Sequence, residues 1–226
     1  TIVVVIGGAP YDIGAIKKNN HTIVWSWYNG SENGNALADV LLGEINPSGK
    51  LPFSFPASLN ESPAHSDGEE AYPGKNHEVF YKEGILVGYR WFDTKNIGPL
   101  YPFGYGLSYT NFQYSGIHTN KKLYKPGETV TVSLDVKNIG NYSGKETVQL
   151  YVSKPNSKVE RAEKELKAFK KIWVGKGQLA KINVSMPVKN YAYFDSNDST
   201  WIVEPGDYII LAGSSSKDIR QTVTVT

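Results

Sequence analysis

The chain of 226 residues is 40% hydrophobic and 20% charged, and it carries a formal net charge of +2. This length suits one large domain or two ordinary ones. Because the charge is small and basic residues are interspersed with acidic ones, the sequence argues against a nucleic-acid-binding protein. It contains no cysteine, which excludes disulfides and cysteine-based zinc sites, and no apolar run approaches the roughly 20 residues of a membrane span.

Two apolar, β-branched runs open the chain and predict strands buried in a parallel sheet. They span residues 2–6 (IVVVI) and 22–27 (TIVWSW). A helix is expected after the second run, with Ser31 as its N-cap and Gly43 at its C-terminal end. Its apolar face would consist of Ala36, Leu37, Val40 and Leu41. This order indicates an α/β fold that is entered at a strand, so we expect the chain to be part of a longer protein.

The next segments lead out of the α/β part. Residues 50–56 (KLPFSFP) predict a short strand whose prolines confine it to the edge or end of a sheet. Residues 57–78 are polar and lack any apolar period, which predicts a long surface loop. Apolar and aromatic residues return at 79–92, and the Gly-, Pro- and Tyr-rich stretch 99–110 predicts compact irregular structure. We place the first domain at residues 1–113.

Residues 114–226 have a different pattern, in which short runs alternate apolar and polar residues between turn signals. The run 128–136 (ETVTVSLDV), for example, places its apolar residues on one face of a strand. Those residues are Val130, Val132, Leu134 and Val136. Several such runs without a helix signal predict an antiparallel β-sandwich of seven strands. The absence of Cys excludes a disulfide-pinned immunoglobulin domain but not the fibronectin-type variant. The fold class is therefore α/β followed by all-β.

Residues that could carry chemistry are few. Glu83 is the best single candidate for a catalytic carboxylate, with the alternative that Glu83 and Arg90 serve a structural ion pair or backbone contacts. No Gly-x-Ser-x-Gly elbow supports a serine hydrolase. The histidines lack metal-ligand spacing, and they are His21, His65, His77 and His118. We predict neither a metal site nor a cofactor.

The stretch 25–34 (WSWYNGSENG) is the more informative candidate for ligand binding. It lies where a parallel strand ends and a helix begins, which is where α/β folds place ligands. Trp27 or Tyr28 could stack on the face of a sugar, and Glu32 could accept hydrogen bonds from hydroxyls. The alternative is that the tryptophans pack the end of the sheet.

Several motifs together resemble glycoside hydrolase family 3, the β-glucosidases and β-xylosidases. The segment VWSWYNGSENGNALADVLLGEINPSGKLPFSFP (24–56) resembles the end of the family's α/β-sandwich domain. YKEGILVGYRWFD and PLYPFGYGLSYTNFQYS are similar to the segments that follow it, and ELKAFKKIWV and WIVEPGDYIILAGSSSKDIR to its fibronectin type III-like domain. The resemblance covers nearly the whole chain. Asn29 stands where the family often has Pro, and Asn33 where it often has Gly.

The resemblance implies a retaining, exo-acting β-glycosidase, which uses two carboxylates. It implies that the nucleophile is an Asp of an N-terminal barrel domain and that the acid/base is a Glu on a loop preceding Thr1, so no catalytic residue is assigned here. What carries over is the loop 27–34, with Trp27, Tyr28 and Glu32 as substrate-binding candidates near the mouth of the active site. The partners implied are the barrel domain, in the same or another chain, and a β-linked oligosaccharide or glycoside.

This chain would therefore be a structural and site-closing part of such an enzyme, inactive alone. The alternative is a non-catalytic carbohydrate-binding or adhesion module, which would need a solvent-facing row of aromatic residues; Tyr191, Tyr193 and Trp201 are the candidates. Asn-x-Ser/Thr sequons permit a glycosylated protein, and a secreted or periplasmic location is favoured. The sequons begin at Asn20, Asn29, Asn60, Asn141, Asn183 and Asn197.

Overall fold

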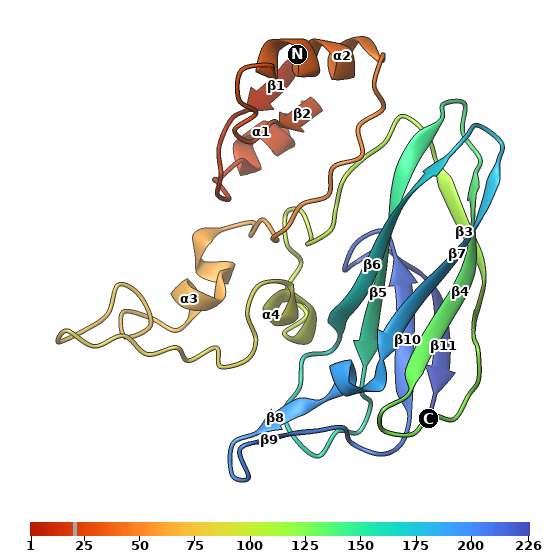
Figure 1. Ribbon diagram of the computed structural model, residues 1–226. Coiled ribbons are helices and arrows are strands. Elements are labelled where there is room, and N and C mark those ends of the chain that lie inside the picture. Colours follow the sequence, from red (N-terminus) through yellow and green to blue (C-terminus); the bar gives the residue numbers. More distant parts are fainter. Residues whose placement is uncertain (20–21) are drawn as a thin grey trace.

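The computed structural model describes residues 1–19 and 22–226 (Figure 1), so the sequon at Asn20 and the histidine His21 lie outside the described residues. The N-terminal part, residues 1–42, contains two short strands and two helices. Its elements are β1 (Ile2–Val5), α1 (Gly14–Lys18), β2 (Thr22–Trp25) and α2 (Asn33–Leu42). β1 and β2 pair in parallel, with Val3 opposite Ile23, as the two apolar runs predicted.

Helix α2 confirms the predicted helix but begins later than expected. Its N-cap is Glu32 and not Ser31, and no side chain caps it; the Glu32 carboxylate instead accepts a hydrogen bond of 2.6 Å from the Asn35 side chain. Gly43 ends the helix in the left-handed conformation, at φ 84°, which glycine adopts without the steric cost of a Cβ. Neither α1 nor α2 contains a buried residue. Leu37 and Val40 of α2 are only half-buried and Leu42 is 79% exposed, so the described part of the chain covers the apolar side of α2 incompletely.

Residues 50–56 do not form the predicted strand. Phe55 makes an isolated bridge with Tyr101, and the Leu51 N–H donates to the Tyr105 carbonyl at 2.8 Å. Pro52 and Pro56 have no N–H, so a regular ladder cannot continue through them. The segment therefore pairs irregularly with the Gly- and Pro-rich stretch 99–110.

Residues 57–78 form a long surface segment, as predicted, which contains two short helical turns. These are η1 (Leu59–Glu61) and α3 (Pro63–Ser66), and the chain returns at α4 (Tyr89–Thr94). Figure 1 shows residues 67–85 projecting beyond α3 and α4. Within the described ranges, no helix has the length and apolar character needed to cross a membrane.

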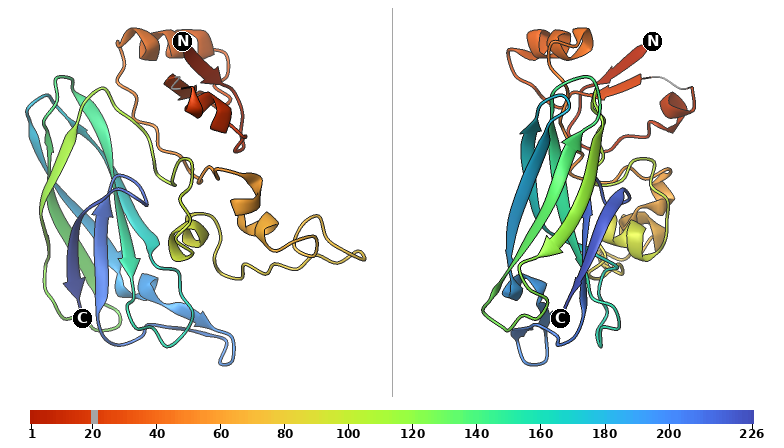
Figure 2. Two further views of the ribbon diagram at one scale, coloured as in Figure 1. Left: turned by 180° about the vertical axis from the view of Figure 1, so that it is seen from behind. Right: turned by 90° about the vertical axis from the view of Figure 1, so that its right-hand side faces the viewer.

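The C-terminal part is the predicted antiparallel β-sandwich (Figure 2). One sheet has the order β11-β10-β5-β6 and the other β3-β4-β7. The strands are β3 (Phe112–Thr119), β4 (Thr129–Asn138), β5 (Gly144–Ser153), β6 (Glu165–Val174), β7 (Leu179–Pro187), β10 (Tyr208–Gly213) and β11 (Ile219–Val225). All four apolar residues predicted for the inner face of β4 are buried in the core. The domain boundary at residue 113 stays a prediction.

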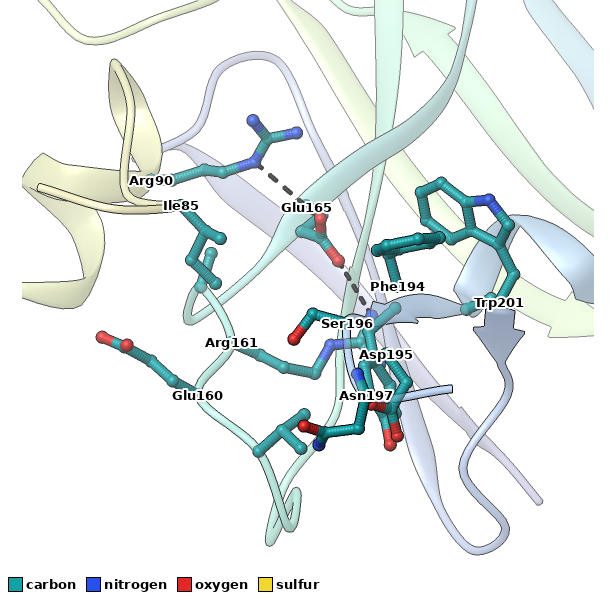
Figure 3. Close-up of a pocket in the computed structure, with 14 residues that line it drawn as sticks. Ile85, Arg90, Glu160, Arg161, Glu165, Phe194, Asp195, Ser196, Asn197 and Trp201 are labelled. Atoms are coloured by element: carbon teal, nitrogen blue, oxygen red, sulfur yellow. Dashed lines mark hydrogen bonds and ion pairs between the residues drawn. The ribbon is translucent and has the colours of Figure 1, made fainter. Parts of the chain in front are cut away.

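A hairpin that the sequence analysis missed extends from one end of the sandwich. It consists of β8 (Tyr193–Asp195) and β9 (Thr200–Ile202) and follows the 3₁₀ turn η2 (Val188–Tyr191). Phe194 and Trp201 are opposite each other in the hairpin, with ring centroids 5.4 Å apart. Beside the hairpin lies a hollow that the loop before β6 also lines (Figure 3).

The turn after α2 joins the two parts of the molecule. The Asn46 side-chain amide donates to the Ser143 carbonyl at 3.0 Å, and its oxygen accepts from the Ser108 hydroxyl and the Tyr109 N–H at 2.9 and 2.8 Å. One side chain therefore binds both the irregular stretch and the sandwich.

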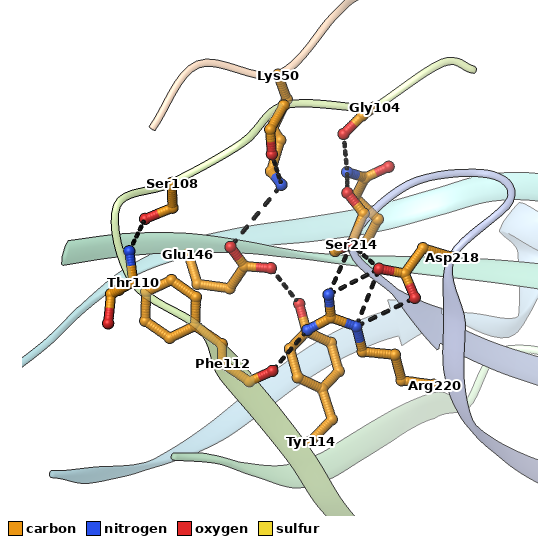
Figure 4. Close-up of polar contacts among 12 residues, drawn as sticks. Lys50, Gly104, Ser108, Thr110, Phe112, Tyr114, Glu146, Ser214, Asp218 and Arg220 are labelled. Carbon is orange, nitrogen blue, oxygen red and sulfur yellow. Dashed lines mark hydrogen bonds and ion pairs between the residues drawn. The ribbon is translucent and has the colours of Figure 1, made fainter. Parts of the chain in front are cut away.

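Lys50 makes the second connection (Figure 4). Its ammonium donates to the Gly106 carbonyl at 3.1 Å and lies 3.8 Å from the buried Glu146 carboxylate, which accepts 2.7 Å from the Tyr114 hydroxyl. Burial lowers the pKa of Lys50, and the charge of Glu146 opposes that shift. The motif Asn-Pro-Ser-Gly-Lys thus anchors the α/β part to strand β5.

Candidate functional site

The loop 25–34 leaves the carboxyl end of β2 and is held to β1 at its start. The Ser26 N–H donates to the Val5 carbonyl at 2.8 Å, and the Trp25 indole N–H donates to the Gly7 carbonyl at 3.1 Å. Trp27 has φ 56°, a left-handed conformation that a bulky residue rarely adopts. The surrounding contacts must therefore hold the loop in this shape.

Aromatic side chains supply those contacts. The ring of Trp25 lies 4.8 Å from that of Phe55 and 6.1 Å from that of Trp27, which in turn lies 5.6 Å from that of Phe53. Phe55 extends the cluster to Tyr101, at 6.1 Å. The half-buried Trp27 therefore packs the end of the sheet, as the alternative interpretation held, and forms a support for the loop.

Tyr28 and Glu32 are placed differently from Trp27. The Tyr28 side chain is 74% exposed, and its ring lies over Gly8, where an added Cβ would come within 2.9 Å of a ring carbon. Glu32 is also exposed at the start of α2. No hydrogen bond or ring contact joins the side chains of Trp27, Tyr28 and Glu32 in the structure as described. Tyr28 and Glu32 are thus exposed to solvent, whereas Trp27 is half-buried.

The two departures from the family pattern contact each other. The Asn29 side-chain amide donates to the Asn33 side-chain oxygen at 2.7 Å, and it also donates to the Ser26 hydroxyl. Sequence reasoning noted both residues and missed their contact, because the two lie on either side of a turn. Together they close the base of the loop.

Glu83 and Arg90 do not form the ion pair that was one alternative for them; Glu83 makes a backbone contact instead, in which its carbonyl accepts a hydrogen bond of 3.0 Å from the Leu86 N–H. Arg90 is the second residue of α4, and its guanidinium lies 3.9 Å from the Glu165 carboxylate at the start of β6. The salt bridges of the described residues leave Glu83 without a basic partner. Nor do residues 1–19 and 22–226 bring three or more His, Asp or Glu side chains into an arrangement that could hold a metal ion.

The row of exposed aromatic residues that the alternative, a carbohydrate-binding module, would need does not form from the three candidates. Tyr191 is buried in the core, with its ring 5.3 Å from that of Tyr208, because η2 turns it inward. Tyr193 is half-buried, and only Trp201 of the three is well exposed, at 69%. Its exposed neighbour is Phe194, which the sequence analysis did not single out.

Comparison with known proteins assigns both parts of the chain. The family model described as "Glycosyl hydrolase family 3 C-terminal domain" matches residues 1–109, and the "Fibronectin type III-like domain" matches residues 146–216. The chain belongs to glycoside hydrolase family 3. It corresponds to the C-terminal region of these enzymes, with their α/β and fibronectin type III-like parts.

Relatives match nearly the whole chain. It is 44% identical over 223 residues to "Beta-glucosidase BoGH3A" of Bacteroides ovatus, covering 99% of this chain and 30% of the relative. It is also 44% identical over 218 residues to "Thermostable beta-glucosidase B" of Acetivibrio thermocellus, covering 96% of this chain and 28% of that protein. The crystal structure of a Bifidobacterium adolescentis family 3 β-glucosidase superposes with a TM-score of 0.90 at 36% identity, covering 100% of this chain and 32% of that one. The chain thus spans about 30% of the length of the relatives it matches.

Proposed function

We propose that the chain is the C-terminal, structural and site-closing part of a retaining β-glycosidase of the β-glucosidase type. Its substrates would be terminal β-linked sugars of oligosaccharides or glycosides. The observation that carries the proposal is the loop 27–34, which is held on an aromatic support at the carboxyl ends of two parallel strands, where α/β folds bind ligands. Relatives named β-glucosidases match it over almost its full length.

Each residue of the loop would have a distinct role. The open ring of Tyr28 would stack on the apolar face of a pyranose, and Glu32 would accept hydrogen bonds from sugar hydroxyls. Trp27 would act through Tyr28 as a positioning residue, because its own ring is engaged with Phe53. The nucleophile and the acid/base would be supplied by the rest of the enzyme, in which we place a barrel domain.

That remaining part would also cover surface that the chain leaves open. Ile2 and Ile6 are more than half exposed at β1, and Leu42 is exposed on α2. Burying apolar area of this kind contributes about 25 cal/mol per Å². Parallel sheets in α/β proteins are normally covered on both faces. The two-stranded sheet β1–β2 would therefore be completed by strands and helices from the remaining part of the enzyme.

The test compares the 226-residue chain with the full-length polypeptide that carries it. The full-length protein should hydrolyse chromogenic β-glucosides or β-xylosides, and the chain alone should not exceed a matched blank, because it would lack both catalytic carboxylates. Turnover by the chain alone that is abolished by Glu83→Gln would overturn the proposal. It would place a catalytic carboxylate within this sequence.

A pair of tyrosine variants tests the loop itself. In the full-length enzyme, Tyr28→Ala should raise KM by about two- to thirteenfold, as expected for one lost stacking contact of about 0.5–1.5 kcal/mol. The matched control is Tyr142→Ala, which removes a 58%-exposed ring on the sandwich. Equal KM values for the two variants would remove Tyr28 from the site.

A further inference from the structure

We propose that the hollow beside the β8–β9 hairpin is a second carbohydrate-binding site, separate from the loop 27–34, and that it takes a neutral oligosaccharide. The hollow has a volume of about 510 Å³ and lies between three segments of the chain, 85–90, 159–165 and 192–201 (Figure 3). Small-molecule sites typically occupy about 300–1,000 Å³. The space therefore accommodates sugar units, and none of the residues that line it belongs to the proposed active-site loop 27–34.

The hairpin supplies an apolar wall that is costly to leave in water. Phe194 is 51% exposed and Trp201 69% exposed, and the two rings pack edge to face. Each sits on a strand of only three residues, so neither ring is needed to fill the sandwich core. Aromatic rings placed in this way offer flat faces for the C–H groups of pyranose rings, which form the apolar side of a sugar.

Two arginines line the hollow, Arg161 with a buried side chain and Arg90 with a more exposed one. The Arg161 side chain is 8% exposed, and its Nη2 is occupied by Glu165 and the Tyr191 carbonyl, both at 2.9 Å. Its Nη1 lies 3.7 Å from the Glu204 carboxylate and has no hydrogen-bond partner among the described residues. The Nε of Arg90 is likewise buried without a hydrogen-bond partner among those residues. Both of these atoms are shielded from solvent, so the donors that a ligand could reach are the terminal N–H groups of Arg90, whose side chain is 37% exposed.

The charge of the lining favours a neutral ligand. The lining residues include two cations, Arg90 and Arg161, and three carboxylates, Glu160, Glu165 and Asp195. An anion would meet an excess of negative charge, and both guanidiniums already face Glu165. Hydroxyl groups donate and accept, so a polyhydroxylated ligand can use the arginine donors and the carboxylate acceptors together. Flat aromatic faces next to both kinds of polar group fit an oligosaccharide better than a peptide.

The test is calorimetric titration of the 226-residue chain with cellotetraose, xylotetraose and maltotetraose. We expect saturable binding of at least one of them, weakened about tenfold or more by Trp201→Ala and also by Phe194→Ala. The matched control is Trp173→Ala, which removes a 61%-exposed indole from the far end of β6. Trp173 lies eight positions after Glu165 along the strand, so the two backbone positions are about 26 Å apart at roughly 3.3 Å per residue. Unchanged melting temperatures of the variants establish that folding is retained.

Indole N–H signals in an NMR spectrum distinguish this site from the proposed active-site loop. Sugar should shift the Trp201 signal and leave Trp173 unmoved, whereas binding at the loop would shift Trp27. The proposal would be overturned if none of the three sugars bound saturably. It would also be overturned if Trp201→Ala left the binding unchanged, or if sugar shifted the indole signal of Trp27 alone. None of these results bears on hydrolysis by the full-length enzyme, which tests the proposed function separately.

Discussion

Asp93 is the buried charge that holds helix α4 against the sandwich, and its loss should be the most destabilising single change at the junction. Its carboxylate lies 2.9 Å from the Lys164 ammonium and 2.9 Å from that of Lys217. The side chains of Asp93 and Lys164 are 1% and 5% exposed, whereas Lys217 is at the surface. Asp93→Ala would leave the Lys164 ammonium buried without its main partner.

The magnitude follows from that burial. Removing one partner of a buried ion pair costs about 3–5 kcal/mol, because the remaining charge stays out of water uncompensated. For a chain of this size, about 2–4 °C of melting temperature corresponds to each kcal/mol, so we expect a fall of about 6–20 °C. Glu163→Ala is the matched control: Glu163 also pairs with Lys164, at 3.3 Å, but is more than half exposed and should contribute less than about 1 kcal/mol.

Urea and thermal unfolding of the 226-residue chain measure both variants. Adding Lys164→Met to Asp93→Ala should restore part of the lost stability, because the unpaired buried charge is then gone. A loss of less than 1 kcal/mol in Asp93→Ala, or a loss equal to that of Glu163→Ala, would refute the reasoning.

Three further predictions concern the anchors of the sandwich. Gly106→Ala should destabilise the chain by about 1–3 kcal/mol in urea titrations, because its Cβ would collide with the Gly49 carbonyl oxygen, whereas Gly49→Ala, with open space around its Cβ position, should be nearly neutral. Asn46→Ala removes three hydrogen bonds and should lower the free energy of unfolding by about 3 kcal/mol. The hydrogen bond from Arg220 holds the pKa of Asp218 below its usual value of 3.8, so this pair stabilises fully above about pH 5 and progressively less as pH falls through the folded-state pKa. Asp218→Asn should therefore flatten the acid side of a plot of melting temperature against pH, and an unchanged acid side would contradict this.

Where a local period decides the structure, the sequence sufficed. The alternation in β4 determines which residues face the core, since a strand turns successive side chains to opposite faces. Val130, Val132, Leu134 and Val136 are buried, and the residues between them are only half-buried, as that period requires. Helix α2 ends at Gly43 because the left-handed conformation there favours glycine. These elements depend on neighbours close in the chain.

Where the deciding partner is distant, the sequence did not suffice. Residues 50–56 have the composition of a strand, yet two prolines and a partner stretch rich in Gly and Pro leave only irregular pairing. Arg90 binds Glu165, 75 positions away, and not the nearby Glu83. Tyr191 was a candidate for the surface because period alone does not tell which face of a short segment meets the core. The β8–β9 hairpin has strands of three residues, too short to show a period.

The contacts described above connect the candidate loop to the sandwich in one continuous series. Trp27 and Trp25 pack on Phe53 and Phe55, the backbone of that segment pairs with residues 101–105, and Asn46 and Lys50 bind the sandwich at either side of the turn. The side chains in these contacts are wholly or partly buried, and the segment 50–56 is also held by backbone hydrogen bonds. A movement of the loop would therefore disturb the segment 50–56. This gives a physical reason for the sandwich to accompany the loop that we propose closes the site: the sandwich fixes the support on which the loop rests. It also explains why the Asn-Pro-Ser-Gly-Lys motif, which contains no catalytic group, is bound so closely by both parts of the chain.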